Sequence, residues 1–132
     1  MTTTVHPFLM FQGAVAEAAM TLYTSLFADG EVLEISRYGA GGPGPEGSIV
    51  QAAFRIAGQT VRCSDSPVPH AFDFTPSSSL FVTCESAEQL AKLAEALSEG
   101  GKWLMPVNNY GFSRSFGWLN DRFGVSWQLN LP

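Results

Sequence analysis

The sequence predicts an α+β fold of two similar βαβββ modules whose strands form a curved, cup-shaped mixed sheet. Two observations carry this prediction. Strand-like and helix-like segments alternate so that each of two amphipathic helices follows one strand and precedes strands only. The chain also repeats itself with a shift of 71 residues, the distance from Leu9 to Leu80. We therefore expect a single domain over residues 1–132, with modules at about 4–65 and 78–131.

The first module is expected to open with a strand and a helix. Residues 4–11 form a short apolar run, and the spacing of Ala18, Leu22 and Leu26 predicts a helix over 14–27. Glycine, proline and alternating apolar residues then mark the remaining segments. These are a strand at 31–38, a mobile Gly/Pro loop at 39–47, a strand at 49–56, a turn at 58–59, a strand at 60–64 and a Pro/Ser-rich linker at 65–79.

The second module repeats this order. Residues 80–84 predict a strand, and Ser86 with Gln89 forms a capping-box pattern at the start of a helix. The helix is amphipathic, with apolar residues spaced by three and four at Leu90, Leu93, Ala94 and Leu97. Three strands are expected after it, at 103–107, 116–120 and 125–129, the last two joined by a turn at 121–124.

The internal repeat indicates that the two halves of the chain have the same architecture. With the shift of 71 residues, Glu17 falls on Glu88 and Gly30 falls on Gly101 without a gap. The alternative, a chance match of two amphipathic segments, stays open at this point. If each helix covers the outer face of its own sheet, the inner faces curve into a cup, and concave surfaces of this kind bind small ligands.

Composition and charge narrow the classes of partner. The net charge of −5 does not fit a nucleic-acid-binding protein or an anionic membrane surface. No run of 18 apolar residues exists, and the N-terminal residues do not resemble a signal peptide, so we expect a cytoplasmic protein. Cys63 and Cys84 are then expected to be free thiols.

We expect the cup to hold a small, partly planar molecule against aromatic and polar side chains. Neighbouring strand residues point to opposite faces, so Trp127 packs under the helix if Gln128 faces the cup. Cys63, beside Arg62, is either a reactive thiol or a buried strand cysteine. Residues 108–112 form either a lid or a plain connection. The residues expected to line the cup are Cys63, Asp65, Trp103, Asn108, Tyr110, Phe116, Trp118 and Gln128.

Several segments together resemble a known family. They include FLMFQG, FTPSSSLFV, LMPVNNYGFS and above all FGWLNDRFGVSWQLNL. In these the chain is similar to the PhnB-like branch of the vicinal oxygen chelate superfamily, which contains glyoxalases, bleomycin-resistance proteins and dioxygenases. The branch is often labelled 3-demethylubiquinone-9 3-methyltransferase. The resemblance covers nearly the whole chain and implies tandem βαβββ modules, a small-molecule ligand and a homodimer, but no settled reaction.

The resemblance also raises the question of a metal ion. Relatives that use a metal hold a divalent ion with His, Gln or Glu side chains from the first and last strands of each module. The matching positions in this chain give Gln128 and His6 as candidate metal ligands, with Cys63 or Asp65 as further candidates. Glutamine brings no charge, and the chain has only two histidines. We therefore expect no certain cofactor and at most a weakly bound divalent metal.

Three functions are weighed on these grounds. The first is a glyoxalase-like small-molecule-binding protein without a full metal site, and the second is a metal-dependent enzyme of the glyoxalase or dioxygenase type. The third is the methyltransferase of the family label. A methyltransferase of the dinucleotide-binding type needs a glycine-rich loop that leads from a strand into a helix. In this chain the glycine-rich stretch at 39–47 precedes a strand instead, so we expect no methyltransferase activity.

Overall fold

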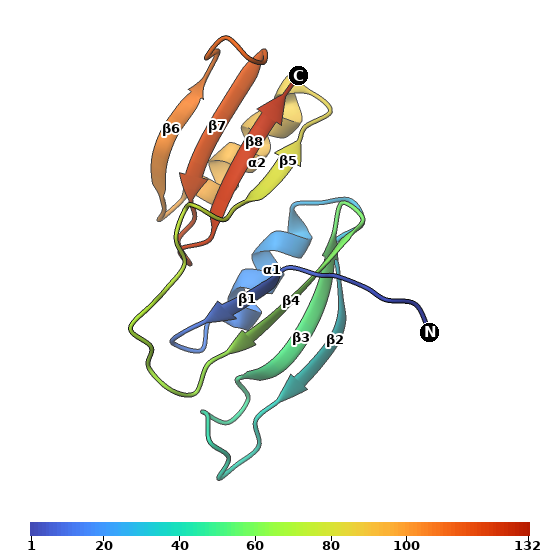
Figure 1. Cartoon of the computed structure of the whole chain (residues 1–132), viewed down its shortest axis with the longest axis vertical. Coiled ribbons are helices and arrows are strands. Elements are labelled where there is room, and N and C mark those ends of the chain that lie inside the picture. Colours follow the sequence, from blue (N-terminus) through green and yellow to red (C-terminus); the bar gives the residue numbers. More distant parts are fainter. The chain divides into compact units, whose positions relative to one another are not determined.

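A computed structural model describes residues 1–132, which divide into two compact units, Met1–His70 and Ala71–Pro132. Each unit contains one four-stranded mixed sheet and one helix (Figure 1). The α+β fold with two βαβββ modules is therefore confirmed. No helix in the chain is long and apolar enough to span a bilayer.

The first unit has its strands in the order β1-β4-β3-β2. Strand β1 pairs with β4 in parallel, and the other pairs are antiparallel. The elements are β1 (Phe8–Phe11), α1 (Ala16–Ser25), β2 (Glu31–Arg37), β3 (Ile49–Ile56) and β4 (Gln59–Asp65). Strand β1 is shorter than the expected 4–11 and begins directly after Pro7, which has no N–H to give to a sheet.

The second unit repeats this topology in the order β5-β8-β7-β6, with β5 and β8 parallel. Its elements are β5 (Leu80–Thr83), α2 (Ala87–Ser98), β6 (Lys102–Asn108), β7 (Ser115–Asn120) and β8 (Ser126–Leu131). The two helices begin at Ala16 and Ala87, which are 87 − 16 = 71 residues apart. The shift read from the sequence is thus the shift between the two helix starts, whereas β3 and β7 begin only 115 − 49 = 66 residues apart.

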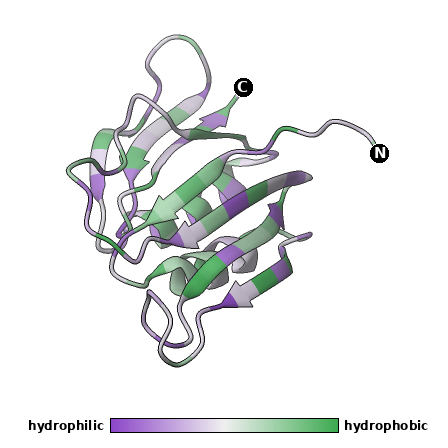
Figure 2. Ribbon diagram, turned by 60° about the horizontal axis from the view of Figure 1, so that its bottom comes forward, coloured by the Kyte–Doolittle hydropathy of each residue, from purple (hydrophilic) through white to green (hydrophobic).

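One face of each sheet is covered by the helix of its own unit. In the first unit, Tyr23 of α1 is fully buried and its ring lies 6.0 Å from that of Phe54 on β3. In the second unit, Leu93 and Leu97 of α2 are buried together with Trp127 of β8. Hydrophilic and hydrophobic residues are interspersed along the strands (Figure 2), and along β4 and β8 buried residues alternate with less buried ones, so each of these strands has a buried, helix-covered side and a more exposed side.

The two helices begin in different ways. The hydroxyl of Ser86 accepts the N–H of Gln89 at 3.1 Å, and the side-chain oxygen of Gln89 accepts the N–H of Glu85 at 2.7 Å. The predicted cap is therefore confirmed, although the Gln89 side chain bonds the N–H of Glu85 and not that of Ser86. Helix α1 has no side-chain cap at Val15. Its first N–H group, that of Ala16, is bonded instead by Asp65 at the end of β4.

Candidate ligand-binding face

The sheet of the second unit has a face that no helix of that unit covers, which we call the helix-free face. Along β8, Trp127 and Leu129 are fully buried on the side of α2, whereas Gln128 between them is half-buried. The register places the other members of the face on neighbouring strands, because cross-strand partners point to the same side. The face comprises Phe81, Thr83, Lys102, Met105, Asn108, Phe116, Trp118, Asn120, Ser126, Gln128 and Asn130.

Aromatic rings gather on and beside this face. Gln128 lies between Phe81 on β5 and Trp118 on β7, and the Phe81 side chain is 57% exposed. Beyond β6, the connecting loop adds Tyr110 and Phe112, whose ring centres lie 6.3 Å and 5.0 Å from that of Phe116. Phe112 is 64% exposed, although large apolar side chains are usually buried. The chain therefore presents several aromatic surfaces that it does not bury itself.

The loop that carries these rings is held by its own polar groups. The Tyr110 hydroxyl donates to the Pro106 carbonyl at 2.5 Å, and the Asn109 side chain accepts the N–H of Gly111 at 2.8 Å. Gly111 has φ +101°, a conformation that favours glycine. The position of the aromatic pair is thus fixed by specific bonds within the loop.

Three side-chain hydrogen bonds on the helix-free face include a serine hydroxyl. The Trp118 indole N–H donates to Ser126 at 2.8 Å, and the Gln128 amide nitrogen donates to Ser79 at 2.7 Å. The Ser113 hydroxyl donates to the Asn130 side-chain oxygen at 2.6 Å. The strand residues of the face include no carboxylate, and Lys102 is their one cation. The side-chain oxygen of Asn120 is enclosed and has no hydrogen-bond partner.

The structure brings five of the eight predicted cup residues together. Phe116, Trp118, Gln128 and Asn108 lie on the helix-free face, and Tyr110 contacts Phe116. Sequence reasoning missed Phe81 and the serine partners, and it included Phe112 only as part of the segment 108–112. It placed Ser79 in the Pro/Ser-rich linker at 65–79, and only the pairing of β5 with β8 brings Ser79 to Gln128.

Trp103 lies on the other face of the same sheet. It pairs with Leu119, which is buried on the side of α2. A Cβ atom at Gly117 would approach the Trp103 ring to 2.9 Å, and Gly117 pairs with the buried Leu129. The ring thus packs on the bare backbone of Gly117 on the helix-covered side, so Trp103 does not belong to the helix-free face.

Cys63 and Asp65 belong to the first unit and lie on its helix-covered face. Both alternate with half-buried residues along β4, and Cys63 has no exposed surface. Burial, followed by the charge of Asp65, raises the pKa of the Cys63 thiol to about 12. The thiol is therefore protonated at neutral pH, which does not suit a nucleophile. Of the two interpretations of Cys63, the buried strand cysteine agrees with this position.

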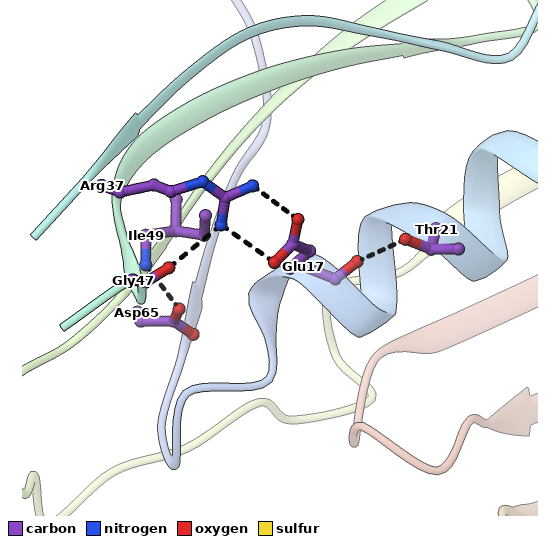
Figure 3. Close-up of polar contacts among 6 residues, drawn as sticks. All are labelled: Glu17, Thr21, Arg37, Gly47, Ile49 and Asp65. Carbon is purple, nitrogen blue, oxygen red and sulfur yellow. Dashed lines mark hydrogen bonds and ion pairs between the residues drawn. The ribbon is translucent and has the colours of Figure 1, made fainter. Parts of the chain in front are cut away.

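The Asp65 side chain connects several elements of the first unit (Figure 3). One carboxylate oxygen accepts the N–H of Ala16 at 2.9 Å, and the other accepts the N–H of Ile49 at 2.8 Å. One side chain thereby joins the start of α1 to the start of β3 and the end of β4. Since both oxygens are engaged on a buried residue, Asp65 is occupied with holding the fold.

A second polar contact lies beside Asp65. The Arg37 guanidinium donates two bonds to the carboxylate of Glu17, at 2.9 and 2.6 Å, and one to the Gly47 carbonyl at 3.0 Å (Figure 3). The hydrogen bond from Arg37 holds the pKa of Glu17 below its ordinary value. This contact ties the base of the Gly/Pro loop to the first turn of α1.

The side chains available for a divalent metal form a poor donor set. Gln128 brings an uncharged amide whose nitrogen donates to Ser79. His6 belongs to the first unit, and its Nδ1 is enclosed without a hydrogen-bond partner. No group of three or more His, Cys, Asp or Glu side chains lies close enough together to hold a metal ion. These residues do not fit a tight divalent site, and a weak site at Gln128 and His6 stays a prediction.

Comparison with known proteins identifies the family. The family model described as 3-demethylubiquinone-9 3-methyltransferase matches residues 3–130. The chain belongs to this family. It is also 50% identical to the PhnB protein of Bacillus cereus, with a TM-score of 0.95, covering 98% of this chain and 100% of that protein. The predicted membership of the PhnB-like branch of the vicinal oxygen chelate superfamily is confirmed.

Other solved structures extend the likeness. Protein PA1353 of Pseudomonas aeruginosa is 27% identical, with a TM-score of 0.82 and 98% of each chain covered. A glyoxylase/bleomycin resistance protein/dioxygenase domain from Frankia is 14% identical, with a TM-score of 0.67, covering 99% of this chain and 92% of that one. At 14% identity this last likeness concerns the fold alone. Membership of the family shared with the Bacillus cereus protein does not by itself assign a reaction to this chain.

Proposed function

We propose that this PhnB-like protein binds a small, planar, uncharged molecule on the helix-free face of its second unit. The single observation that carries the proposal is the set of aromatic side chains left exposed there. Phe81 and Phe112 keep more than half of their surface accessible, and Trp118 is half-buried between strands. Exposed rings that gather beside a few polar side chains are typical of a binding surface.

The charge of the face supports an uncharged ligand. An anionic ligand is normally held by arginine or by several backbone N–H groups. The strand residues of the helix-free face contain no arginine and no carboxylate, and Lys102 lies at one end, beside Asn120. Stacking on aromatic rings and single hydrogen bonds to amides and hydroxyls are the interactions that this surface offers.

Calorimetric titration with quinoline, a planar uncharged probe, tests the proposal. We expect saturable binding that weakens about 3- to 10-fold in Trp118→Leu, the loss expected for one aromatic contact. Trp103→Leu is the matched control, because it removes an indole from the opposite face of the same sheet. No saturable binding, or equal losses in the two variants, would contradict the proposal.

The proposal includes a cytoplasmic homodimer. The free thiols of Cys63 and Cys84 support a reducing compartment, since two buried cysteines stay unpaired. Sedimentation at micromolar concentration tests the dimer, and a compact monomer would contradict it. For the family label, we expect no binding of S-adenosylmethionine, because the Gly-rich segment joins β2 to β3 and no helix follows it.

A further inference from the structure

The pair Gln128 and Ser79 has a hydrogen-bonding pattern that specifies one kind of ligand. We infer that it binds the amide edge of a planar lactam, in which an N–H group lies next to a carbonyl group. This inference rests on the proposed function, because it names the class of molecule that the helix-free face takes.

The two side chains leave the Gln128 carbonyl oxygen, the second Gln128 N–H and the Ser79 hydroxyl hydrogen unused. The Gln128 nitrogen donates to the Ser79 oxygen at 2.7 Å, and this is the only side-chain bond that either residue makes. The Gln128 carbonyl oxygen is therefore an acceptor without a donor. The hydrogen of the Ser79 hydroxyl is correspondingly a donor without an acceptor, since the oxygen receives the amide and the hydrogen is free to rotate.

This pattern complements a lactam edge. A ligand N–H would donate to the Gln128 oxygen, and the adjacent ligand carbonyl would accept from the Ser79 hydroxyl. A carboxylate has no proton for the glutamine oxygen, and an ammonium group has no lone pair for the serine. A neutral group that both donates and accepts satisfies the Gln128 oxygen and the Ser79 hydroxyl together, and leaving half-buried polar groups unsatisfied weakens binding.

The surrounding rings explain why the ligand should be planar. Gln128 is flanked in register by Phe81 on one neighbouring strand and by Trp118 on the other. Neighbouring strands lie about 4.8 Å apart. A ring that stacks on Trp118 or Phe81 therefore brings its edge within reach of the Gln128 oxygen, so stacking and hydrogen bonding can act on one molecule.

Three probes of nearly equal shape separate these contributions. In 2-quinolone the N–H and carbonyl are adjacent, N-methyl-2-quinolone lacks the N–H, and quinoline lacks both the N–H and the carbonyl. By calorimetry we expect 2-quinolone to bind about 10-fold more tightly than the N-methyl compound, as for one hydrogen bond of ordinary strength. In Gln128→Met, which removes the acceptor for the ligand N–H, this preference should fall to about 2-fold or less. In Ser79→Ala, which removes the donor to the ligand carbonyl, 2-quinolone and its N-methyl derivative should both bind more weakly, by a similar factor.

The control is Ser78→Ala, which changes an exposed neighbouring hydroxyl for which the structure gives no side-chain bond. It should keep the full preference for 2-quinolone. If quinoline binds but 2-quinolone and its N-methyl derivative bind equally, the lactam inference is overturned and the proposed function stands. If none of the three probes binds, the proposed function itself fails.

Discussion

Replacement of Asp65 by asparagine should destabilise the first unit, because the Asp65 carboxylate bonds the starts of both α1 and β3. The asparagine keeps one oxygen, so one of the two N–H groups, that of Ala16 or that of Ile49, faces an NH₂ group. A bond to a charged partner contributes about 1.5–3 kcal/mol, and a charge at a helix N-terminus adds about 0.3–1 kcal/mol. We expect the free energy of unfolding to fall by about 2–4 kcal/mol.

Urea unfolding followed by circular dichroism measures this loss. The free energies of unfolding of wild type and variant are compared with one common slope of free energy against urea concentration. Asp73→Asn is the control, since the exposed Asp73 side chain accepts only the N–H of Phe74. This control should stay within about 0.5 kcal/mol of the wild type. Amide hydrogen exchange localises the effect, because Ala16 or Ile49 should exchange faster in Asp65→Asn. A variant within 0.5 kcal/mol of the wild type, measured with a precision of about 0.3 kcal/mol, would refute the structural role assigned to Asp65.

Three further changes follow from the same structure. Because the hydrogen bond from Arg37 lowers the pKa of Glu17 below 4.5, their exposed ion pair contributes a small stabilisation at pH values above 4.5. This contribution is lost as the pH falls through the pKa of Glu17 in the folded protein. Glu17→Gln should remove this part of the acid dependence of unfolding. Because burial raises the pKa of Cys63 to about 12 and also raises that of Cys84, neither thiol should react with Ellman's reagent at pH 8 until the protein is unfolded, and rapid reaction in the native state would contradict their burial. Ser86→Ala removes the cap of α2 and should lower the free energy of unfolding by about 1 kcal/mol, measured by the same urea titration.

The fold could be predicted from the sequence because its signals are local. Both helices show their apolar spacing, Ser86 and Gln89 mark the start of α2, and the repeat aligns the two helix starts. Helix α1 is the instructive contrast, since its first N–H is bonded by Asp65, a residue 49 positions away. A contact over such a distance leaves no signature near Ala16.

The site was predictable in part, for the same reason. The alternation along β8 correctly separates Gln128 from Trp127, because neighbouring strand residues point to opposite faces. Trp103 and Ser79 depended on strand register instead. Trp103 lies on the helix-covered face because it pairs with Leu119, and Ser79 reaches Gln128 because β5 runs parallel to β8. Register between distant strands is set by the whole sheet, so a single sequence does not give it.

Two indole N–H groups on opposite faces of one sheet allow a direct test of ligand binding. Trp118 donates to Ser126 on the helix-free face, and Trp127 donates to Asp121 on the helix-covered side. We would follow both indole resonances by ¹H–¹⁵N correlation spectroscopy during titration with 2-quinolone. The account predicts a saturable shift of the Trp118 indole signal and of the Gln128 side-chain amide, with the Trp127 signal unmoved. A shift of Trp127 alone, or no shift of either indole at saturating probe, would contradict it.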